Sequence, residues 1–417
     1  MSPVSGTLKN WIRYVREPTT SNRVTWIARA VVALLAAALT FSFISFVSSL
    51  DPTTDLTIYF MAAEAVHKGK NPYSFAVETT YPGTGTVQWG YLYPPLLASI
   101  FSPLVPFGFS VVHLCWALVT TGAMLLTAWV LYAGRRAEGK GIGLGWLLIA
   151  ISFWPIAIDG FERGQINAIV LGVLALILYG LRCNRHGFVG LGIALAVQVK
   201  VMPIIFMVLL LDRTMKNART AFLFGSLVVI SGIAFWVGVE IWQQFMTSAL
   251  STAAGGSAWI SPENLAISHL LCLVFPALDI STALWLQRGV VALGVGSVAR
   301  CILRNGGYDK EQIFCRLTVL MFLASPIVWY HHAVWLIFPI VWCWRNRRHF
   351  SERFLLVSVT LCMTGYRYSE LAICTHVGWS PDILIVEPLV FAVSLLALWM
   401  LMRSEVGPKT QNVYGCT

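Results

Sequence analysis

The sequence predicts an all-α polytopic membrane protein. Of its 417 residues, 57% are hydrophobic and only 12% are charged, which is about half of the ~25% charged residues found in soluble globular proteins. The mean hydropathy is +0.72, and many apolar segments approach the ~20 residues that cross a bilayer as a helix. These observations exclude a soluble enzyme, a disordered chain and a nucleic-acid-binding domain. They leave room for about twelve transmembrane helices.

Basic residues predict the orientation of the chain. The net charge of +10 fits a membrane protein whose Lys and Arg residues lie mainly in cytoplasmic loops. Residues 1–30 form a basic tail, and the apolar stretch 31–50 that follows is longer than the ~7–15-residue core of a secretory signal. We therefore expect a cytoplasmic amino tail and a retained first helix. Further apolar segments run over 109–133, 142–158, 165–181, 219–239, 283–303, 354–376 and 383–402.

Three other apolar stretches are interrupted. Four prolines interrupt Leu92–Phe107, which we expect to lie at the surface without crossing. Lys200 lies in the middle of Phe188–Leu211, and basic residues flank both ends, so this stretch is predicted to be a hairpin of two short helices. Ile313–Trp344 would be about 48 Å long as one helix, too long for a ~30 Å core. It is predicted to turn back at Trp329-Tyr330-His331-His332.

This topology has about twelve helices, with both termini cytoplasmic and most of the 29 Lys and Arg residues inside. If Leu92–Phe107 crosses instead and the Lys200 stretch is one helix, five basic residues move outside. We expect a single transmembrane domain over 31–403 in the plasma membrane and a cytoplasmic carboxyl tail over 404–417. The main outer loops are 51–91, 159–164 and 241–282, and the outer side contains more than half of the 19 Asp and Glu residues.

The first outer loop is predicted to contain two interfacial helices. From Asp55 onward, apolar residues recur at helical spacing up to a C-capping Gly69. An amphipathic helix of this kind lies in the membrane interface. Asn71-Pro72-Tyr73 then turns the chain. The pair Pro94-Pro95 begins the second surface helix, since proline is tolerated in a first turn.

Two charged residues of the outer side each have two interpretations. Asp55 is either an N-cap, which satisfies backbone donors at the start of its helix, or a general base held there. Arg163 either forms an ion pair with Glu162 or Asp159 or binds an anion.

Lys200 and the histidine pair complete the predicted site. A lysine inside an apolar stretch is costly and is by default functional. His331 and His332 are either interfacial residues packed beside Trp329 and Trp335 or hydrogen-bond donors to an anion. Adjacent histidines without a third ligand do not make a metal site. A lipid-linked phosphate ester suits this set, because its phosphate can contact the cations while the carboxylate activates an acceptor hydroxyl.

Several motifs resemble those of a known family and occur in the same order. They are Asp55-x-x-x-Tyr59-x-x-x-x-Glu64-x-x-x-x-Gly69-x-Asn71-Pro72-Tyr73, Tyr93-Pro94-Pro95-Leu96, Gly164-Gln165-Ile166-Asn167, Lys200-x-x-Pro203 and Ser325-Pro326-x-x-Trp329-x-His331-His332. The chain thus resembles membrane glycosyltransferases of the GT-C fold. The nearest group is glycosyltransferase family 87, the polyprenyl-phosphate-mannose-dependent α-mannosyltransferases and related arabinofuranosyltransferases.

This resemblance implies a GT-C-type fold and inverting transfer of a sugar, most often mannose, from a polyprenyl phosphate on the outer face, without a metal or another cofactor. It implies that Asp55 is the general base on a glycan or glycolipid acceptor, and that Lys200, His331 and His332 lie near the donor phosphate. Arg163, in its anion-binding interpretation, is expected at the same phosphate. Substrate contacts are expected from Tyr59, Tyr73, Tyr93, Gln165, Asn167 and Asn264. The run Ser261–Ala266 departs from the family's usual Asn-Gln-Ser type signature, which affects acceptor recognition.

Three other functions remain open at this point. A transporter or flippase of lipid-linked glycans would show internal repeats and ionisable residues near the midplane, whereas here the polar residues favour one face and the two halves show no repeat. A polymerase or ligase would use the same type of donor but transfer a whole oligosaccharide. A membrane scaffold without activity would not need a carboxylate beside a group of cations.

Overall fold

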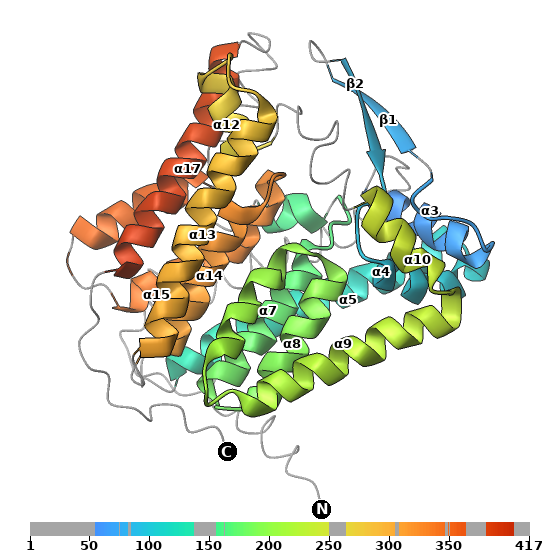
Figure 1. The fold of residues 1–417 in the computed structure, drawn as a ribbon, viewed down its shortest axis with the longest axis horizontal. Coiled ribbons are helices and arrows are strands. Elements are labelled where there is room, and N and C mark those ends of the chain that lie inside the picture. Colours follow the sequence, from blue (N-terminus) through green and yellow to red (C-terminus); the bar gives the residue numbers. More distant parts are fainter. Residues whose placement is uncertain are drawn as a thin grey trace, which may run out of the picture.

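The computed structural model describes residues 55–74, 76–81, 85–136, 156–161, 163–249, 264–304, 308–346, 349, 351–363 and 381–403. The predicted tails, the first helix and most of the segment 142–158 lie outside the described residues. The described part is predominantly helical, as the composition predicts (Figure 1).

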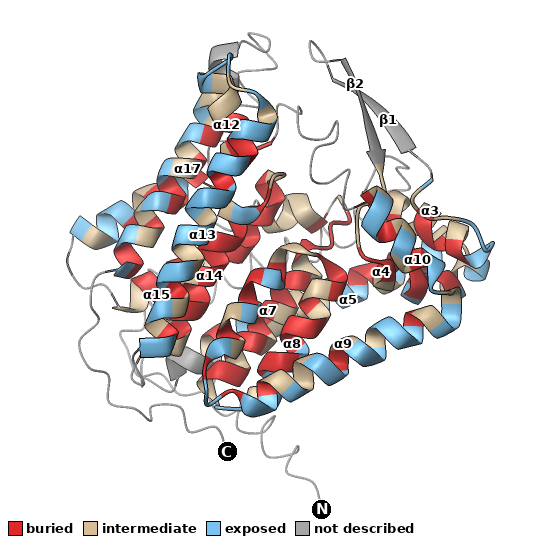
Figure 2. Ribbon diagram, in the orientation of Figure 1, coloured by how far each residue is buried: buried red, intermediate tan, exposed pale blue. Residues whose placement is uncertain are grey.

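Four helices of the described part are long and apolar enough to cross a membrane. They are α5 (Phe109–Arg136), α9 (Lys216–Val237), α13 (Ile280–Arg304) and α17 (Pro381–Arg403). Large apolar side chains point outward from them; Phe235 of α9 is 93% exposed and Leu293 of α13 is 78% exposed. Figure 2 shows both helices mostly exposed. Such surfaces are stable in lipid, so the chain is a helical membrane protein. The full number of spans remains a prediction.

The helices around the core cross closely. The short apolar helices α7 (Asn167–Arg182) and α8 (His186–Val199) pack between α5 and α9. A Cβ at Gly190 of α8 would lie 1.9 Å from the carbonyl oxygen of Ala218 in α9, and one at Gly172 of α7 would lie 2.7 Å from Cβ of Ala123 in α5. Glycine at these crossings lets the backbones approach, as is usual where membrane helices pack.

The chain breaks at the places that the sequence predicts. The proline-rich stretch forms α4 (Pro95–Phe101) and the 3-10 helix η1 (Ser102–Phe107), each too short to span a bilayer. Helix α8 ends before Lys200, and the chain resumes as the 3-10 helix η2 (Met202–Leu211). The long apolar stretch 313–344 is interrupted between two helices that contact each other. Its parts are α14 (Lys310–Ala324), the 3-10 helix η5 (Tyr330–Leu336) and α15 (Ile337–Asn346).

The segment predicted to be the first outer loop contains the predicted helix and an unpredicted hairpin. Helix α3 (Asp55–His67) ends at Gly69, which adopts a left-handed φ of 64°. Strands β1 (Ala76–Tyr81) and β2 (Gly85–Gly90) then pair antiparallel, with Ala76 opposite Gly90. The prediction of an all-α fold misses this hairpin, although both strands are rich in Thr, Val and aromatic residues that favour strands.

The other predicted outer loops are also partly helical. Residues 156–161 are helical, and Gly164 lies in the turn before α7. In the segment 241–282, the structure describes α10 (Glu240–Gln244), a single π-helical turn η3 (Phe245–Ala249) and α12 (Ile267–Val274). Residues 250–263, with the departing Ser-Pro-Glu, lie outside the described part.

Charged residues join three core helices at one end. Glu311 in the first turn of α14 accepts from Arg182 at the end of α7 at 2.6 Å and from Arg345 at the end of α15 at 2.8 Å. The side chains of Arg182 and Arg345 are each 4% exposed. Helix α7 has 16 residues, so its other end, at Asn167, lies about 24 Å away. The candidate site lies at that other end.

Candidate functional site

Asp55, the first residue of α3, is held by the turn that precedes α7. Its backbone N–H donates to the carbonyl of Arg163 at 3.0 Å, and its Oδ2 accepts a hydrogen bond from Nε2 of Gln165. The carboxylate and the backbone of Asp55 are therefore both fixed by residues more than a hundred positions away in the sequence. The alternative of a simple N-cap does not account for the contact with Gln165.

Gly164 makes this contact between α3 and the turn possible. It adopts a left-handed φ of 64°, which costs other residues conformational energy. A Cβ there would lie 2.7 Å from Cβ of Leu56 and 3.3 Å from its backbone nitrogen. The motif Gly164-Gln165 therefore has a physical basis: the glycine admits the start of α3, and the glutamine binds the carboxylate beside it.

The carboxyl group of Asp55 is poised for proton transfer. Burial raises its pKa from 3.8 to about 6, because the carboxylate loses hydration. Arg163, the hydrogen bond from Gln165 and Lys200 oppose this change of pKa. A pKa near 6 leaves Asp55 ionised at neutral pH and makes it a stronger base than an exposed aspartate.

Lys200 is buried at the break between α8 and η2. Its Nζ lies 3.0 Å from Oδ1 of Asn167, the first residue of α7, and 2.7 Å from Nε2 of His332 in η5. The rings of Tyr93 and Trp335 have their centroids 5.5 and 5.3 Å from Nζ, within the ~6 Å range of cation–π contact. The structure thus brings Lys200, His332, Asn167 and Tyr93 together, as the motifs predict.

The histidine pair is anchored by its own 3-10 helix. His332 stacks on Trp335, with ring centroids 5.2 Å apart and planes at 8°, and its Nδ1 accepts from the backbone N–H of Trp329 at 3.1 Å. His331 lies with its Nδ1 3.6 Å from Oδ2 of Asp159. Trp335 also donates from Nε1 to the carbonyl of Asn167 at 2.9 Å.

Trp335 and Asp159 are site residues that the motifs do not identify. The sequence offers one signal for Trp335, its spacing of three residues from His332, which places both rings on one face of a 3-10 helix. For Asp159, the only signal is its proximity to Arg163 in the sequence.

The predicted substrate tyrosines form one aromatic group around the site. Tyr59 of α3 meets Tyr93 edge-to-face at 5.1 Å, and the hydroxyl of Tyr73 donates to the backbone carbonyl of Tyr93 at 3.0 Å. Tyr93 links this group to Lys200. Tyr73 is linked to Lys200 through Tyr93, to which its hydroxyl is hydrogen-bonded.

Arg163, expected near the donor phosphate, and Asn264, expected to contact substrate, both bind other groups of the protein in this structure. Nε of Arg163 pairs with Oδ1 of Asp159 at 3.0 Å, one of the two ion pairs considered above. Asn264 donates to the carbonyl of Pro326 at 3.1 Å and accepts from the backbone N–H groups of Ala266 and Val328. These bonds tie two backbone segments together, which indicates a structural role for Asn264.

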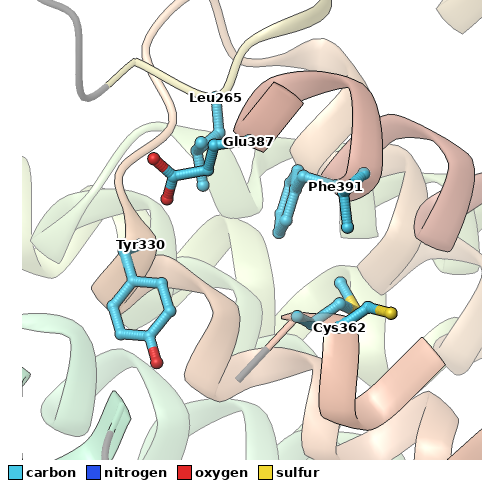
Figure 3. Close-up of a pocket in the computed structure, with 7 residues that line it drawn as sticks. Leu265, Tyr330, Cys362, Glu387 and Phe391 are labelled. Atoms are coloured by element: carbon cyan, nitrogen blue, oxygen red, sulfur yellow. The ribbon is translucent and has the colours of Figure 1, made fainter. Parts of the chain in front are cut away.

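Leu265 and Tyr330 line a pocket next to these segments. Its lining is mainly apolar. The carboxylate of Glu387 lies between Leu265 and Tyr330 in Figure 3. Within the described residues, no group of three or more His, Cys, Asp or Glu side chains could hold a metal ion.

Comparison with known proteins identifies the family. The model of glycosyltransferase family 87 matches residues 91–326, more than half of the chain. The matched segment contains Gln165, Asn167 and Lys200, whereas Asp55 and the histidine pair lie outside it.

Three mycobacterial proteins are similar. One from Mycobacterium tuberculosis, a polyprenol-phosphate-mannose-dependent alpha-(1-2)-phosphatidylinositol mannoside mannosyltransferase, is 26% identical over 80% of this chain and 84% of its own length. Two polyprenol-phosphate-mannose-dependent alpha-(1-2)-phosphatidylinositol pentamannoside mannosyltransferases are also similar. The one from M. tuberculosis is 27% identical and the one from Mycolicibacterium smegmatis is 26% identical, each over 69% of this chain. The alignments span 65% and 68% of those two relatives. The chain belongs to glycosyltransferase family 87.

Proposed function

We propose that this glycosyltransferase moves a single mannosyl unit from a polyprenyl phosphate to a hydroxyl of a glycolipid acceptor, with inversion at the anomeric carbon. One observation carries the proposal. A carboxylate with a raised pKa, Asp55, and a buried pair of nitrogen groups, Lys200 and His332, meet in one site although they come from distant parts of the chain. Such a site can deprotonate a hydroxyl and also receive a phosphate.

Each group has a role in the transfer. Asp55 takes the proton of the acceptor hydroxyl as its oxygen attacks the anomeric carbon. The bond from that carbon to the phosphate oxygen breaks, and negative charge develops on the departing polyprenyl phosphate. Lys200, His331 and His332 stabilise this charge, because fixed donors in a dry site need no reorganisation. Attack opposite to the leaving group inverts the anomeric carbon.

The neighbouring residues orient these groups. Gln165 fixes the carboxylate of Asp55, and Asn167 and Tyr93 flank Lys200. Tyr59 and Tyr73 support Tyr93. Arg163 adds positive charge beside Asp55; its Nε binds Asp159, and its Nη groups are further donors that can bind a donor phosphate.

The names of the relatives support the choice of donor and acceptor. All three depend on polyprenol phosphate mannose and act on phosphatidylinositol mannosides. For this chain, polyprenyl phosphate mannose as donor and a phosphatidylinositol mannoside as acceptor are parts of the proposal.

The outer side of the plasma membrane is the proposed location of the site. The basic residues at the ends of α7 and α15 favour the cytoplasm, and the site lies at the opposite end of α7. Nucleotide sugars are confined to the cytoplasm, so an outer site requires a donor carried in the bilayer. Labelling of a cysteine introduced at Lys68, an exposed residue directly after α3, by a membrane-impermeant reagent tests this; labelling only from the cytoplasmic side contradicts it.

The variant Asp55→Asn tests the base. Vesicles that contain the purified protein receive labelled polyprenyl phosphate mannose and a phosphatidylinositol mannoside. We expect a loss of transfer of at least ~10²-fold, the usual contribution of a general base. Glu64→Gln is the matched control, because Glu64 lies on the same helix, is exposed and pairs only with Lys68 among the described residues. Transfer by Asp55→Asn at the rate of the control would refute the role of Asp55.

The proposed reaction needs no metal ion. Transfer should therefore continue at the same rate in excess EDTA after removal of free divalent cations. A loss of activity in EDTA that Mg²⁺ or Mn²⁺ restores would contradict this part of the proposal.

A further inference from the structure

The hydrogen bonds of His332 determine the protonation state of Lys200. The backbone N–H of Trp329 can only donate, and it points to Nδ1 of His332 at 3.1 Å. Nδ1 must therefore carry a lone pair and no proton. A neutral imidazole has one N–H, so the proton of His332 is on Nε2.

Nε2 of His332 lies 2.7 Å from Nζ of Lys200. With its proton, Nε2 is a donor, so Nζ must accept, and only a neutral amine has a lone pair to do so. If Lys200 were an ammonium, an N–H of Nζ and the N–H of Nε2 would point at each other, two donors without an acceptor between them. The neutral amine also donates one of its own hydrogens to Oδ1 of Asn167 at 3.0 Å. Donors and acceptors then match along the whole series from Trp329 to Asn167.

From this arrangement we infer that Lys200 is a neutral amine in the empty site and that the anionic phosphate of the donor lipid binds together with one proton, which Nζ of Lys200 takes up. This inference rests on the proposed donor. The proton comes from the solvent and converts the amine into an ammonium; no other bond changes. The ammonium no longer accepts from His332, so Nε2–H of His332 and the new N–H of Lys200 both become available to the phosphate oxygens.

The surroundings of Lys200 support both states. Lys200 is only 8% exposed, and burial disfavours an ammonium without a counter-ion. The rings of Tyr93 and Trp335 lie within cation–π range, which stabilises an ammonium by ~0.5–2 kcal/mol. A phosphate beside Nζ then adds the missing counter-charge. Lys200 is thus charged only when the anionic phosphate is bound.

Other titratable groups face Lys200 from the elements around it. They are Asp55 of α3, Tyr93 before α4 and His331 of η5, and behind His331 lies the ion pair of Asp159 and Arg163. An incoming anion favours the protonated form of each of these acids and bases. The experiment must therefore separate Lys200 from Asp55 and His331.

Calorimetry with a prenyl phosphodiester provides this separation. Farnesyl methyl phosphate is the probe, because its single negative charge does not titrate near neutral pH. Its binding enthalpy is measured at one pH in buffers with different ionisation enthalpies, and the slope gives the number of protons taken up. We expect about one proton for the wild-type protein and for the control Lys68→Met, an exposed lysine on the loop after α3.

Two variants assign the proton. Lys200→Arg carries a permanent charge and should bind the probe without proton uptake, whereas Asp55→Asn should retain the uptake. The wild-type affinity should also fall tenfold per pH unit on the alkaline side, and that of Lys200→Arg should not. Binding without uptake in the wild-type protein, or equal uptake in Lys200→Arg, overturns the inference. Failure of the wild-type protein to bind the probe at all would instead count against the proposed donor.

Discussion

Gln165 donates a hydrogen bond from Nε2 to Oδ2 of Asp55 across 110 positions of sequence. The bond joins the turn before α7 to the first residue of α3, and the backbone bond from Asp55 to Arg163 reinforces it. Gln165 stabilises the ionised form of the carboxyl group, whereas burial favours the protonated form. The pKa of Asp55 results from these opposing effects and can be measured in the pH dependence of transfer.

Transfer should depend on the ionisation of Asp55. Its pKa is raised to about 6, so kcat/KM should rise tenfold per pH unit below pH 6, because only the carboxylate is a base. On the alkaline side kcat/KM should fall again, because donor binding requires the proton that Lys200 takes up. The measurement is a pH profile of mannose transfer at low donor concentration. A profile that stays flat down to pH 5 would show that Asp55 does not limit transfer.

The same pKa predicts how Asp55 affects stability. The folded pKa lies above the unfolded value, so ionisation of Asp55 opposes folding, and the protein loses stability as the pH rises from about 4 to about 6. The cost at neutral pH is at most about 3 kcal/mol, since one pKa unit corresponds to 1.36 kcal/mol. Asp55→Asn should therefore unfold at the same or a higher temperature at pH 7. A marked drop would mean that its loss of transfer reflects misfolding.

Replacing Gln165 with Leu should move the pH profile. Without the hydrogen bond the carboxylate is less stable, so the pKa of Asp55 rises and the acid limb moves to higher pH. We expect a change of about one unit, because a hydrogen bond to a charged group contributes ~1.5 kcal/mol.

Gln312→Leu is the control for this change. Gln312 of α14 donates to the carbonyl of Met402 at 2.5 Å, at the end of the molecule opposite the site. This variant should lose stability but keep the acid limb of the wild-type protein. If both variants give the same profile, Gln165 does not set the pKa of Asp55.

Gly164 and Gly69 allow a matched test of the close contact between α3 and the turn. Both adopt a φ of 64°, but a Cβ at Gly69 meets nothing within 4 Å, whereas a Cβ at Gly164 meets Leu56. Gly69→Ala should cost only the backbone strain of about 1 kcal/mol and leave transfer unchanged. Gly164→Ala should in addition displace the start of α3 and lower kcat, since small misplacements of a catalytic group can cost ~10²-fold. Equal effects of the two changes on kcat would disprove the positioning role.

Much of the site could be predicted from the sequence, because its charged and polar residues stand out in a mainly apolar chain. Lys200 in an apolar stretch, the adjacent histidines and Asp55 at a helix start each stand out without a structure. The structure confirms the helix breaks at Lys200 and before Tyr330, which follow from helix length and basic flanks.

Other features could not be assigned from the sequence alone, because the same residues allowed more than one contact. The pairing of Asp159 with Arg163 was one of several options, and the stacking of Trp335 on His332 requires the 3-10 geometry of η5. The β1–β2 hairpin lies in the predicted outer loop, for which only helices and a turn are predicted from the sequence. Asn264 binds backbone groups of neighbouring segments, and its predicted contact with substrate stays a prediction.

The ion group at the far end of α7 should stabilise the fold without affecting the chemistry. Glu311 accepts from both Arg182 and Arg345, and Arg182 also donates to the carbonyl of Val130 in α5 at 2.7 Å. Glu311→Gln leaves two buried guanidinium groups without their shared counter-ion, which should cost ~3–5 kcal/mol. Thermal unfolding in detergent measures this loss.

Glu64→Gln is the control for Glu311→Gln. Glu64 and Lys68 form an ion pair at 2.7 Å with side chains 40% and 54% exposed, and an exposed pair contributes at most ~1 kcal/mol. Below its unfolding temperature, Glu311→Gln should keep the KM for the donor and the pH profile of the wild-type protein, because the group lies about 24 Å from Asn167 along α7. A changed acid limb in this variant would show that the two ends of α7 are coupled, contrary to a purely structural role.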